Sequence, residues 1–508
     1  MTWNLTITLL SGESVELTIE PDRSVNFLRR KAEQALQRPL KALFGGGRLN
    51  NPSRLCDVGV QDGDLLTAIV REPGPIMESY RKARAFAAIC DGEVVTWGAP
   101  HFGGQLPARL RPRLVDVASV VVSAYACCAL RNDGEVVTWG SELSGGDSEE
   151  VTHELRDVIE IYATDAAFAA LKGNGSVVTW GDARNGGSSK EVSGDLFGVQ
   201  KIFASTTAFA AIRSDGRVVT WGARNAGGDS SAVQDQLRDV KQIHATNVAF
   251  AAVRGDGSVV TWGAVSGGGD CSEVADQLVN IGQIHSTTRS FAALSADGKV
   301  VTWGAPSTGG DSSTVQGELL DVVQLAASET AFVAIREDGA LFTWGDSKIP
   351  DVELSAVSRQ VLATDSAFAA LGVDGKVVTW GSKKGGDSSG VQEQLVEVQQ
   401  LFASEGAFAA LRSDGRVVTW GDPAFGGDSH TVQDELVDVH RVHAASGAFA
   451  AVRHDGRVVT WGDPWGGGDS SNLRTASTTL VTSELSHKDD RRSALKKVLD
   501  AIDESGED

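Results

Sequence analysis

The chain has 508 residues, 58 of them glycine, and a formal net charge of −21. This length exceeds what one ordinary core organises, so several domains or a repeat array are expected. The acidity excludes a direct nucleic-acid surface, which needs clustered positive charge, and leaves proteins as the expected partners, although net charge also serves solubility. Five cysteines without CxxC pairs indicate neither a disulfide framework nor a zinc site. With no signal peptide or membrane span expected, the sequence predicts a cytoplasmic or nuclear protein.

Residues 1–72 predict a small separate domain. Leu5–Leu10 and Val15–Ile19 alternate like the strands of a hairpin, Val25–Leu36 has a helical pattern, and short strands continue through Ile69. In length, in order of elements and in the segments LLSGESVELTIEP, LFGGGRL, RLCDVGVQDGD and LLTAIV, this region resembles ubiquitin. The resemblance implies a β-grasp fold.

The same resemblance implies a recognition surface. Leu10, Leu43 and Ile69 fall on the positions of ubiquitin's hydrophobic patch, while Thr67 replaces the histidine beside it. The patch implies partners in the ubiquitin pathway; the alternative is that some of these side chains pack in the β-grasp core. Ubiquitin's terminal Gly-Gly is missing because the chain continues through residues 71–75, so the resemblance implies a fixed module and no detachable tag.

Residues 73–79, with two prolines, are expected to form a fairly stiff linker, and residues 80–470 then repeat one unit ten times. Most copies are 41 residues apart, with extremes of 42 and 36. Each copy ends in a Trp-Gly pair, whose tryptophans are Trp97, Trp139, Trp180, Trp221, Trp262, Trp303, Trp344, Trp380, Trp420 and Trp461.

One copy, Lys241–Leu278, illustrates the unit. Two short apolar runs are followed by a Gly-Asp-Gly turn and a β-branched run ending at Trp262, which predicts three antiparallel strands. A Gly-Gly-Asp loop follows, as at Asp229, which we expect to cap or turn the chain and not to bind metal. Ser231 and Gln234 have capping-box spacing, which predicts a short helical turn.

The pattern I-x-A-x-x-x-A-F-A-A-[IL]-R-x-D-G-x-V-V-T-W-G resembles the repeat of the regulator of chromosome condensation family. Its short period is closer to the compact blades of the propeller-shaped bacterial β-lactamase inhibitor. The expected fold is mainly β: a propeller-like array of ten three-stranded blades preceded by a β-grasp domain. The resemblance also implies partner binding through loops on one face.

The number of blades leaves alternatives open. Family members are typically seven-bladed, whereas here seven tryptophans precede the 36-residue interval and three follow it. Ten blades could close as one wide ring, stay open, or divide into seven and three; we expect a single continuous array because the sequence resumes without a linker. The first strand of the first blade is expected near residues 79–83, and Leu480–Ser483 is a candidate closing strand.

The last segment, residues 471–508, is charged and leaves the repeat. Leu495, Val498, Leu499 and Ile502 follow the spacing of one helix face. This pattern predicts a helix that packs on the last blade or, alternatively, docks a partner.

The repeats predict no catalytic residues, because a catalytic site needs different groups held in one geometry and no interruption of the repeat supplies them. No metal or cofactor is expected: one Gly-Gly-Asp per 41 residues lacks the nine-residue period of calcium repeats. Function is therefore expected in loops that differ between blades. A first set follows the Trp-Gly pairs and supplies the candidate partner-binding residues His101, Phe102, Arg184, Arg224, Lys383, Phe425 and Trp465. A second set joins the first two strands of each blade.

These features together predict a non-enzymatic protein-binding scaffold or adaptor, linked to the ubiquitin pathway through its first domain. The family resemblance raises one alternative, a guanine-nucleotide exchange factor for a Ran-type GTPase. Exchange needs an inserted wedge on one propeller face, and the uniform repeat spacing offers no obvious insertion.

Overall fold

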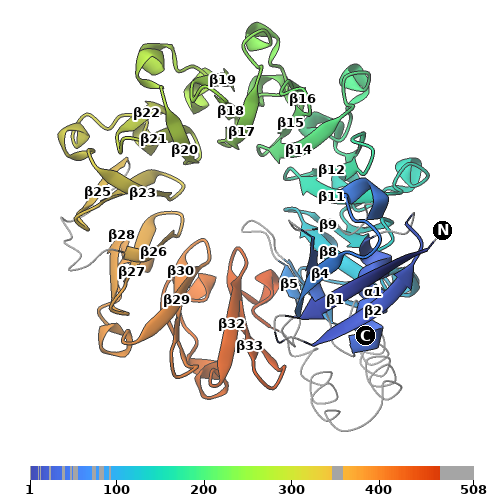
Figure 1. Cartoon of the computed structure of the whole chain (residues 1–508). Coiled ribbons are helices and arrows are strands. Elements are labelled where there is room, and N and C mark those ends of the chain that lie inside the picture. The colour runs from blue at the N-terminus through green and yellow to red at the C-terminus, as the bar shows by residue number, and fades with distance from the viewer. Residues whose placement is uncertain are drawn as a thin grey trace.

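The computed structural model describes residues 2–469 except positions 10, 12, 22–24, 37–39, 46–48, 50–54, 71–75, 79–84, 91–92 and 346–357. The predictions made for Leu480–Ser483 and for the charged tail, residues 471–508, lie outside this range. Within it, a small N-terminal domain accompanies a ring of β-sheets around a central opening (Figure 1).

The N-terminal domain is a four-stranded mixed sheet with one helix, as the alternation predicts. Its elements are β1 (Trp3–Leu9), β2 (Ser14–Ile19), α1 (Val25–Leu36), β3 (Leu40–Phe44), η1 (Leu55–Val58) and β4 (Leu65–Val70). The sheet order is β2-β1-β4-β3, with β1 and β4 parallel. Leu5, Ile7 and Leu28 are at most 1 % exposed and form the core between sheet and helix.

Among the described residues, ten three-stranded antiparallel sheets follow, one for each repeat. The first strands are β5 (Ile76–Glu78), β8 (Val117–Val122), β11 (Val158–Ala163), β14 (Val199–Ala204), β17 (Val240–Ala245), β20 (Ile281–Ser286), β23 (Val322–Ala327), β26 (Ser358–Ala363), β29 (Val398–Ala403) and β32 (Val439–Ala444). The second strands are β6 (Ala85–Cys90), β9 (Ala126–Arg131), β12 (Ala167–Lys172), β15 (Ala208–Arg213), β18 (Ala249–Arg254), β21 (Ser290–Ser295), β24 (Ala331–Arg336), β27 (Ala367–Gly372), β30 (Ala407–Arg412) and β33 (Ala448–Arg453). The third strands are β7 (Glu93–Gly98), β10 (Val136–Gly140), β13 (Val177–Gly181), β16 (Val218–Gly222), β19 (Val259–Gly263), β22 (Val300–Gly304), β25 (Leu341–Gly345), β28 (Val377–Gly381), β31 (Val417–Gly421) and β34 (Val458–Gly462).

The first blade corrects one expectation. Its first strand is β5, which pairs Ile76 with Ile89. The strand therefore lies within the segment expected to be a linker, and before the predicted position at residues 79–83. Because β5 lacks the apolar spacing seen in the other first strands, the repeat pattern could not identify it.

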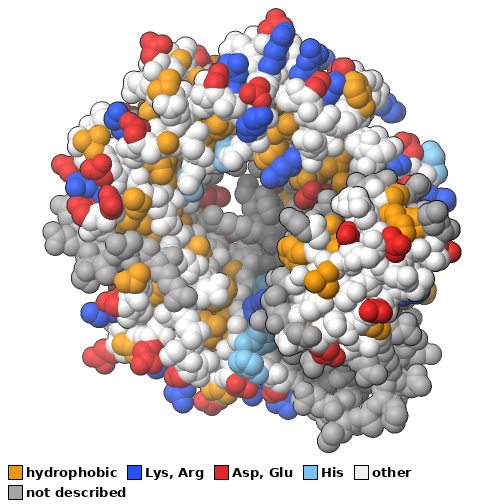
Figure 2. Space-filling view, in the orientation of Figure 1, with side chains coloured by type: hydrophobic (Ala, Val, Ile, Leu, Met, Phe, Trp, Pro, Cys, Tyr) orange, Lys and Arg blue, Asp and Glu red, His pale blue; other side chains and the backbone are white. Residues whose placement is uncertain are grey.

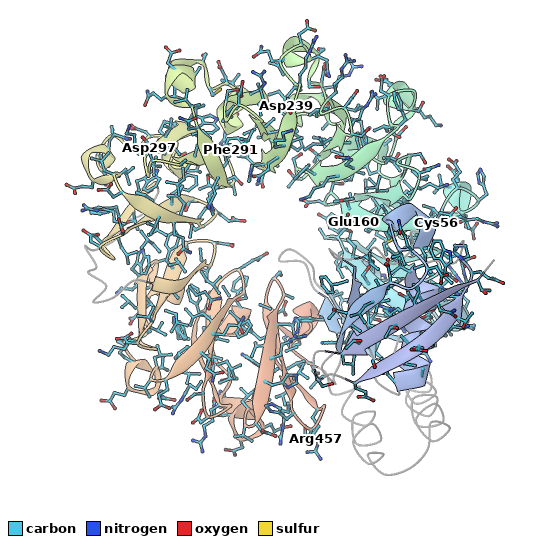
Figure 3. The ribbon with its side chains drawn as sticks, in the orientation of Figure 1. Cys56, Glu160, Asp239, Phe291, Asp297 and Arg457 are labelled. Carbon is cyan, nitrogen blue, oxygen red and sulfur yellow. The ribbon has the colours of Figure 1, made fainter. Side chains whose placement is uncertain are left out.

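Each blade presents its first strand to the central opening, with the second and third strands farther out (Figure 1). The core lies between blades. Phe209 and Ala211 of β15 pack toward the preceding blade, while Ala208 and Ala210 of the same strand receive Phe250 of the next blade. Alternating small and large residues on two faces therefore let neighbouring sheets approach closely. Figure 3 shows the equivalent Phe291 in the body of its blade.

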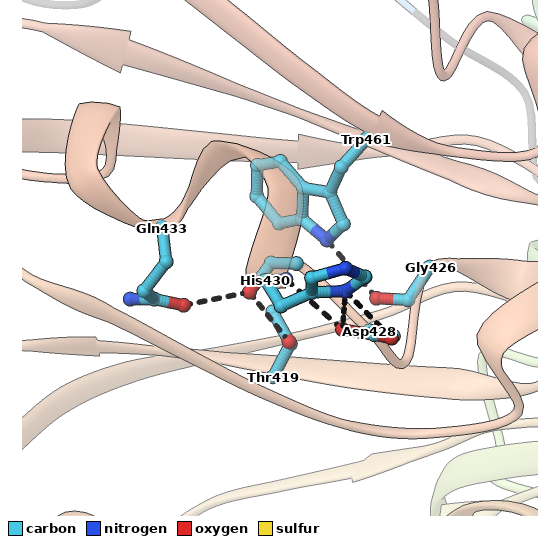
Figure 4. A network of polar contacts seen from close by, with 7 residues as sticks. Thr419, Gly426, Asp428, His430, Gln433 and Trp461 are labelled. Atoms are coloured by element: carbon cyan, nitrogen blue, oxygen red, sulfur yellow. Dashed lines mark hydrogen bonds and ion pairs between the residues drawn. The ribbon is translucent and has the colours of Figure 1, made fainter.

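A stacked pair of rings recurs in nine of the ten described blades. Phe291 and Trp303 have ring centroids 5.2 Å apart, and the indole Nε1 of Trp303 donates to the carbonyl of Gly268, in the preceding blade's loop, at 3.0 Å. Figure 4 shows the same bond from Trp461 to Gly426. In the second blade Cys127 stands where other blades have phenylalanine, beside Trp139.

The same contacts join the last blade to the first. Trp97 donates to the carbonyl of Gly467 at 3.1 Å, and Phe86 packs with Ala448 and Ala450 in one buried cluster. Across the shortened repeat, Val333 and Phe368 also share a cluster. The ten blades therefore close as one ring, which excludes both the open array and the division into seven and three.

The N-terminal domain touches the second blade. Arg29 Nη2 of α1 donates to Asn132 Oδ1 at 3.0 Å, and Asn132 Nδ2 donates to Asp116 Oδ1 at 2.8 Å. Asn132 is 8 % exposed, whereas the equivalent Ser214 and Ser413 are exposed. The domain thus covers the hairpin-turn side of this blade.

Candidate functional site

Both sets of variable loops lie on one face of the ring. Each blade's first and third strands run in the same direction, so the loop between the first two strands and the loop after Trp-Gly leave from the same end. The hydroxyl of Thr246, in the first of these loops, donates to the carbonyl of Gly267 in the second at 2.9 Å; Ser404 repeats this with Phe425 at 2.8 Å. We call this side the loop face. The Asp-Gly hairpin turns lie on the opposite face.

Backbone hydrogen bonds join neighbouring blades on the loop face. In six of the described blades, one residue donates its N–H to the carbonyl of its counterpart in the next blade, at 2.8–3.3 Å. The pairs in the described residues are Asp165 to Thr206, Thr206 to Asn247, Asn247 to Thr288, Thr288 to Glu329, Asp365 to Glu405 and Glu405 to Ser446. The backbone at these positions is therefore fixed, and only the side chains vary from blade to blade.

In eight of the described blades, the loop after Trp-Gly begins with a single 3₁₀ turn at the outer circumference (Figure 1); the loop after Trp380 begins instead with α2 (Lys383–Gly386). Each of these 3₁₀ turns ends at a glycine with positive φ, such as Gly268 at +87°. A Cβ on Gly268 would lie 2.7 Å from the ring of Phe291. The glycine thus permits both the left-handed backbone and the close approach that places its carbonyl against Trp303.

The Gly-Gly-Asp segment turns the chain, as predicted. Asp229 Oδ1 accepts the N–H of Ser231 at 2.9 Å, and its pKa is lowered chiefly by this bond. The prediction of a capping box is wrong. Gln234 Oε1 accepts a hydrogen bond from the hydroxyl of Ser230, and Gln234 Nε2 donates to the carbonyl of Val218. The helical turn is a 3₁₀ segment, η9 (Ser231–Val233). Figure 4 shows the equivalent Thr419, Asp428, His430 and Gln433 contacts in a later blade.

The predicted partner-binding loop residues do not form a single site. They are distributed around the circumference, where His101, Arg184, Lys383 and Trp465 are exposed, the last by 72 %. Arg224 is exposed and forms an ion pair with Glu191 at 3.3 Å. The exceptions are the two phenylalanines: Phe102 and Phe425 are half-buried in the loop face.

One groove brings two of these residues together. It has a volume of about 710 Å³ and lies between η2 (Pro100–Phe102) and η4 (Glu142–Ser144), the loops after the first and second blades. Its lining residues are Pro100, His101, Phe102, Gln105, Pro107, Gly140, Ser141, Glu142 and Leu143. Phe102 is held by Tyr125, with ring centroids 5.6 Å apart, and Leu143 is 87 % exposed. We call this feature the η2–η4 groove.

Sequence reasoning missed Leu143, Pro107 and Tyr125 as neighbours of His101 and Phe102. Leu143 stands in a different repeat, 42 residues from His101. The available signal was the longest tryptophan interval, from Trp97 to Trp139, where the Gly-Gly-Asp motif is replaced by a proline-containing segment.

The ubiquitin-like patch is placed differently from its prediction. Leu43 is 0 % exposed and lies in the β-grasp core, so it cannot belong to an exposed patch. On the paired strands β3 and β4, Phe44 and Thr67 are partly exposed, and Leu65 of β4 is 64 % exposed. The physical reason is strand alternation, which puts Leu43 on the inner face. Leu10 lies outside the described residues, and of Ile69 only the backbone, in β4, is described.

In the described part of the chain, no three His, Cys, Asp or Glu side chains converge as metal ligands. None of the helices described there is long and apolar enough to cross a membrane.

No protein-family model matches the chain, and no curated protein matches it. Among solved structures, Prp20p of Saccharomyces cerevisiae is similar at 17% identity over 57% of this chain and 80% of its own, with a TM-score of 0.31. The CRINKLY WD40 ectodomain of the Arabidopsis thaliana receptor kinase ACR4 shares 13% identity over 50% and 90%, with a TM-score of 0.30. The UBL domain of Plasmodium falciparum Dsk2 shares 26% identity over 14% and 100%, with a TM-score of 0.13. These likenesses are partial, and the sheets and contacts themselves establish the fold.

Proposed function

We propose that the protein is a non-enzymatic protein-binding scaffold whose loop face receives its partners. The observation that carries the proposal is the backbone of this face, which hydrogen bonds fix at six junctions between blades while the side chains vary among Asp, Thr, Asn, Glu and Ser. Variable residues on a rigid frame are typical of recognition surfaces. The repeats fit those of the regulator of chromosome condensation type by their residue pattern, and the ubiquitin-like first domain would add a second binding module beside the ring.

The test is capture of protein partners by the immobilised full chain. Trp465→Ala and Arg184→Ala alter exposed residues of the loop face, and the matched control is Arg217→Ala with Arg457→Ala. These control arginines flank Asp-Gly turns on the opposite face and have side chains 58% and 51% exposed. We expect the loop-face variants to lose partners that the control retains; equal capture by all three proteins contradicts the proposal.

A nucleotide-release assay separates the scaffold from the exchange factor. The full chain is added to a Ran-type GTPase loaded with labelled GDP, and release is followed by fluorescence. We expect GDP to leave the GTPase at its intrinsic rate. If catalytic amounts of the chain accelerate GDP release, the protein is an exchange factor and the scaffold proposal is wrong.

A further inference from the structure

Three consecutive loops, where the last blade meets the first two, carry aromatic or apolar tips. The tip is the second residue after the N-cap of each 3₁₀ turn, and in η17 (Pro464–Gly466), η2 and η4 it is Trp465, His101 and Leu143. In the next three loops the tips are the polar residues Arg184, Asn225 and Ser266. We call the first three tips, together with the η2–η4 groove, the closure surface.

The groove in this surface offers apolar groups and one negative charge. Pro100, Phe102 and Pro107 line it, and the ring of Phe102 is held by Tyr125. Among its lining residues, Glu142 is acidic and none is lysine or arginine. An occupant that fits the groove therefore presents an apolar face beside basic side chains.

The charged tail, which lies outside the described residues, contains a segment with this chemistry. Residues 491–498 include four basic residues and no acidic one, although the whole chain has a net charge of −21. The spacing of Leu495, Val498, Leu499 and Ile502 predicts one apolar helix face in the same segment. The tail thus supplies both features that the groove requires.

The tail also leaves the ring beside the closure surface. Gly467, just before the last described residue, Asp469, accepts the indole N–H of Trp97 in the first blade at 3.1 Å. Trp97 is followed within the next three residues by η2, which forms one side of the groove. Residues 470–494 span roughly 80 Å when extended, and such a tether holds the following residues at about millimolar local concentration.

We propose that residues 491–502 form a helix that docks on the closure surface of the same chain. Leu495 and Leu499 lie against Phe102 and Leu143 in this arrangement, and the basic side chains face Glu142. The docking does not depend on the proposed scaffold function. A partner that binds the η2–η4 groove would have to displace the tail, so the tail would regulate access to this part of the loop face.

The first test is a disulfide between tail and groove in the full chain, with the exposed Cys56 replaced by serine. Leu143→Cys with Leu499→Cys should form a disulfide within one chain about tenfold faster than Val265→Cys with Leu499→Cys. Val265 is the matched control because it is exposed in the equivalent turn of the fifth blade. Non-reducing electrophoresis and mass spectrometry under mild oxidation measure the two rates.

The second test is hydrogen exchange in the full chain. Leu495→Asp with Leu499→Asp places two charges on the apolar helix face, so the N–H groups of η2 and η4 should exchange about fivefold faster. Ser493→Asp with Ala501→Asp introduces the same charge on the other side of the predicted helix and should leave exchange in η2 and η4 unchanged.

Three results would overturn the proposal. Equal disulfide rates at Leu143 and Val265 would show that the tail has no preference for the groove. A disulfide between two chains would mean that a second copy occupies the closure surface. Exchange that responds equally to both pairs of aspartates would exclude docking through the apolar face.

Discussion

Histidines occupy an aromatic or aliphatic position of the inner strands. His244 and His285 lie on neighbouring strands β17 and β20, at the place held by Phe203 and Phe402 elsewhere. Burial, followed by the charges of His285 and Lys201, lowers the pKa of His244 to about 4. The sequence shows that this position holds histidine in some copies and phenylalanine in others, but the pKa depends on which neighbour faces the imidazole ring, which only the packed blades show.

Replacing His244 by phenylalanine should reduce the acid sensitivity of the ring. Because the folded-state pKa lies below the ordinary value of 6.5, the unfolded chain binds more protons between pH 6.5 and 4, so the stability present above pH 6.5 is lost as the pH falls toward 4. The loss attributable to this residue is on the order of 1–2 kcal/mol. Urea unfolding at pH 7.5 and pH 5 measures it. His153→Gln, at an exposed site, should retain the wild-type pH dependence; equal slopes for both variants would contradict the assignment.

At the scale of elements, the strands were predictable and the connectors were only partly so. The Asp-Gly turn and the Trp-Gly pair recur at fixed spacing, and strand order follows from them, as in the pairing of Phe250 with Trp262. The 3₁₀ loops could not be derived in detail, because they depend on glycine contacts with the following blade. The η2–η4 groove was beyond prediction for the same reason: two loops from different repeats form it.

A single methyl group in one of these loops should be costly. Gly268→Ala places a Cβ 2.7 Å from the ring of Phe291 and forces a side chain into φ +87°. The left-handed backbone and the clash together should lower the free energy of unfolding by roughly 2–4 kcal/mol. Chemical denaturation measures the loss. Gly194→Ala is the matched control, because nothing lies within 4 Å of the added Cβ; a comparable loss there would show that the loop contact is not the cause.

At the scale of the whole molecule, the sequence could not decide closure. Each blade is rotated relative to its neighbour. The ring closes only if the sum of these rotations brings Trp97 of the first blade against Gly467, which follows the last blade. The repeated residues specify each interface, but a small change in its angle decides between a ring and an open array. In Figure 2, most of the acidic and basic side chains in view lie along the outer circumference of the ring.

The closing interface differs from the other nine in one respect: it joins two blades that are not consecutive in the repeat array. Trp97→Ala removes the stack on Phe86, with centroids 5.3 Å apart, and the bond to Gly467. Trp303→Ala makes the same change inside the array, against Phe291 and Gly268. Each should cost about 3–5 kcal/mol at its own interface.

The two variants should differ in shape, because only at the closing interface can blades part without straining a covalent connection. We expect Trp97→Ala to increase the radius of gyration in small-angle scattering and to accelerate hydrogen exchange in β6 and β33. Trp303→Ala should lose comparable stability and stay compact, since the chain and the closing contact still hold its blades together. Equal compactness of the two variants would mean that the remaining contacts of Phe86 with Ala448 and Ala450 suffice for closure, and that the tryptophan bond is dispensable.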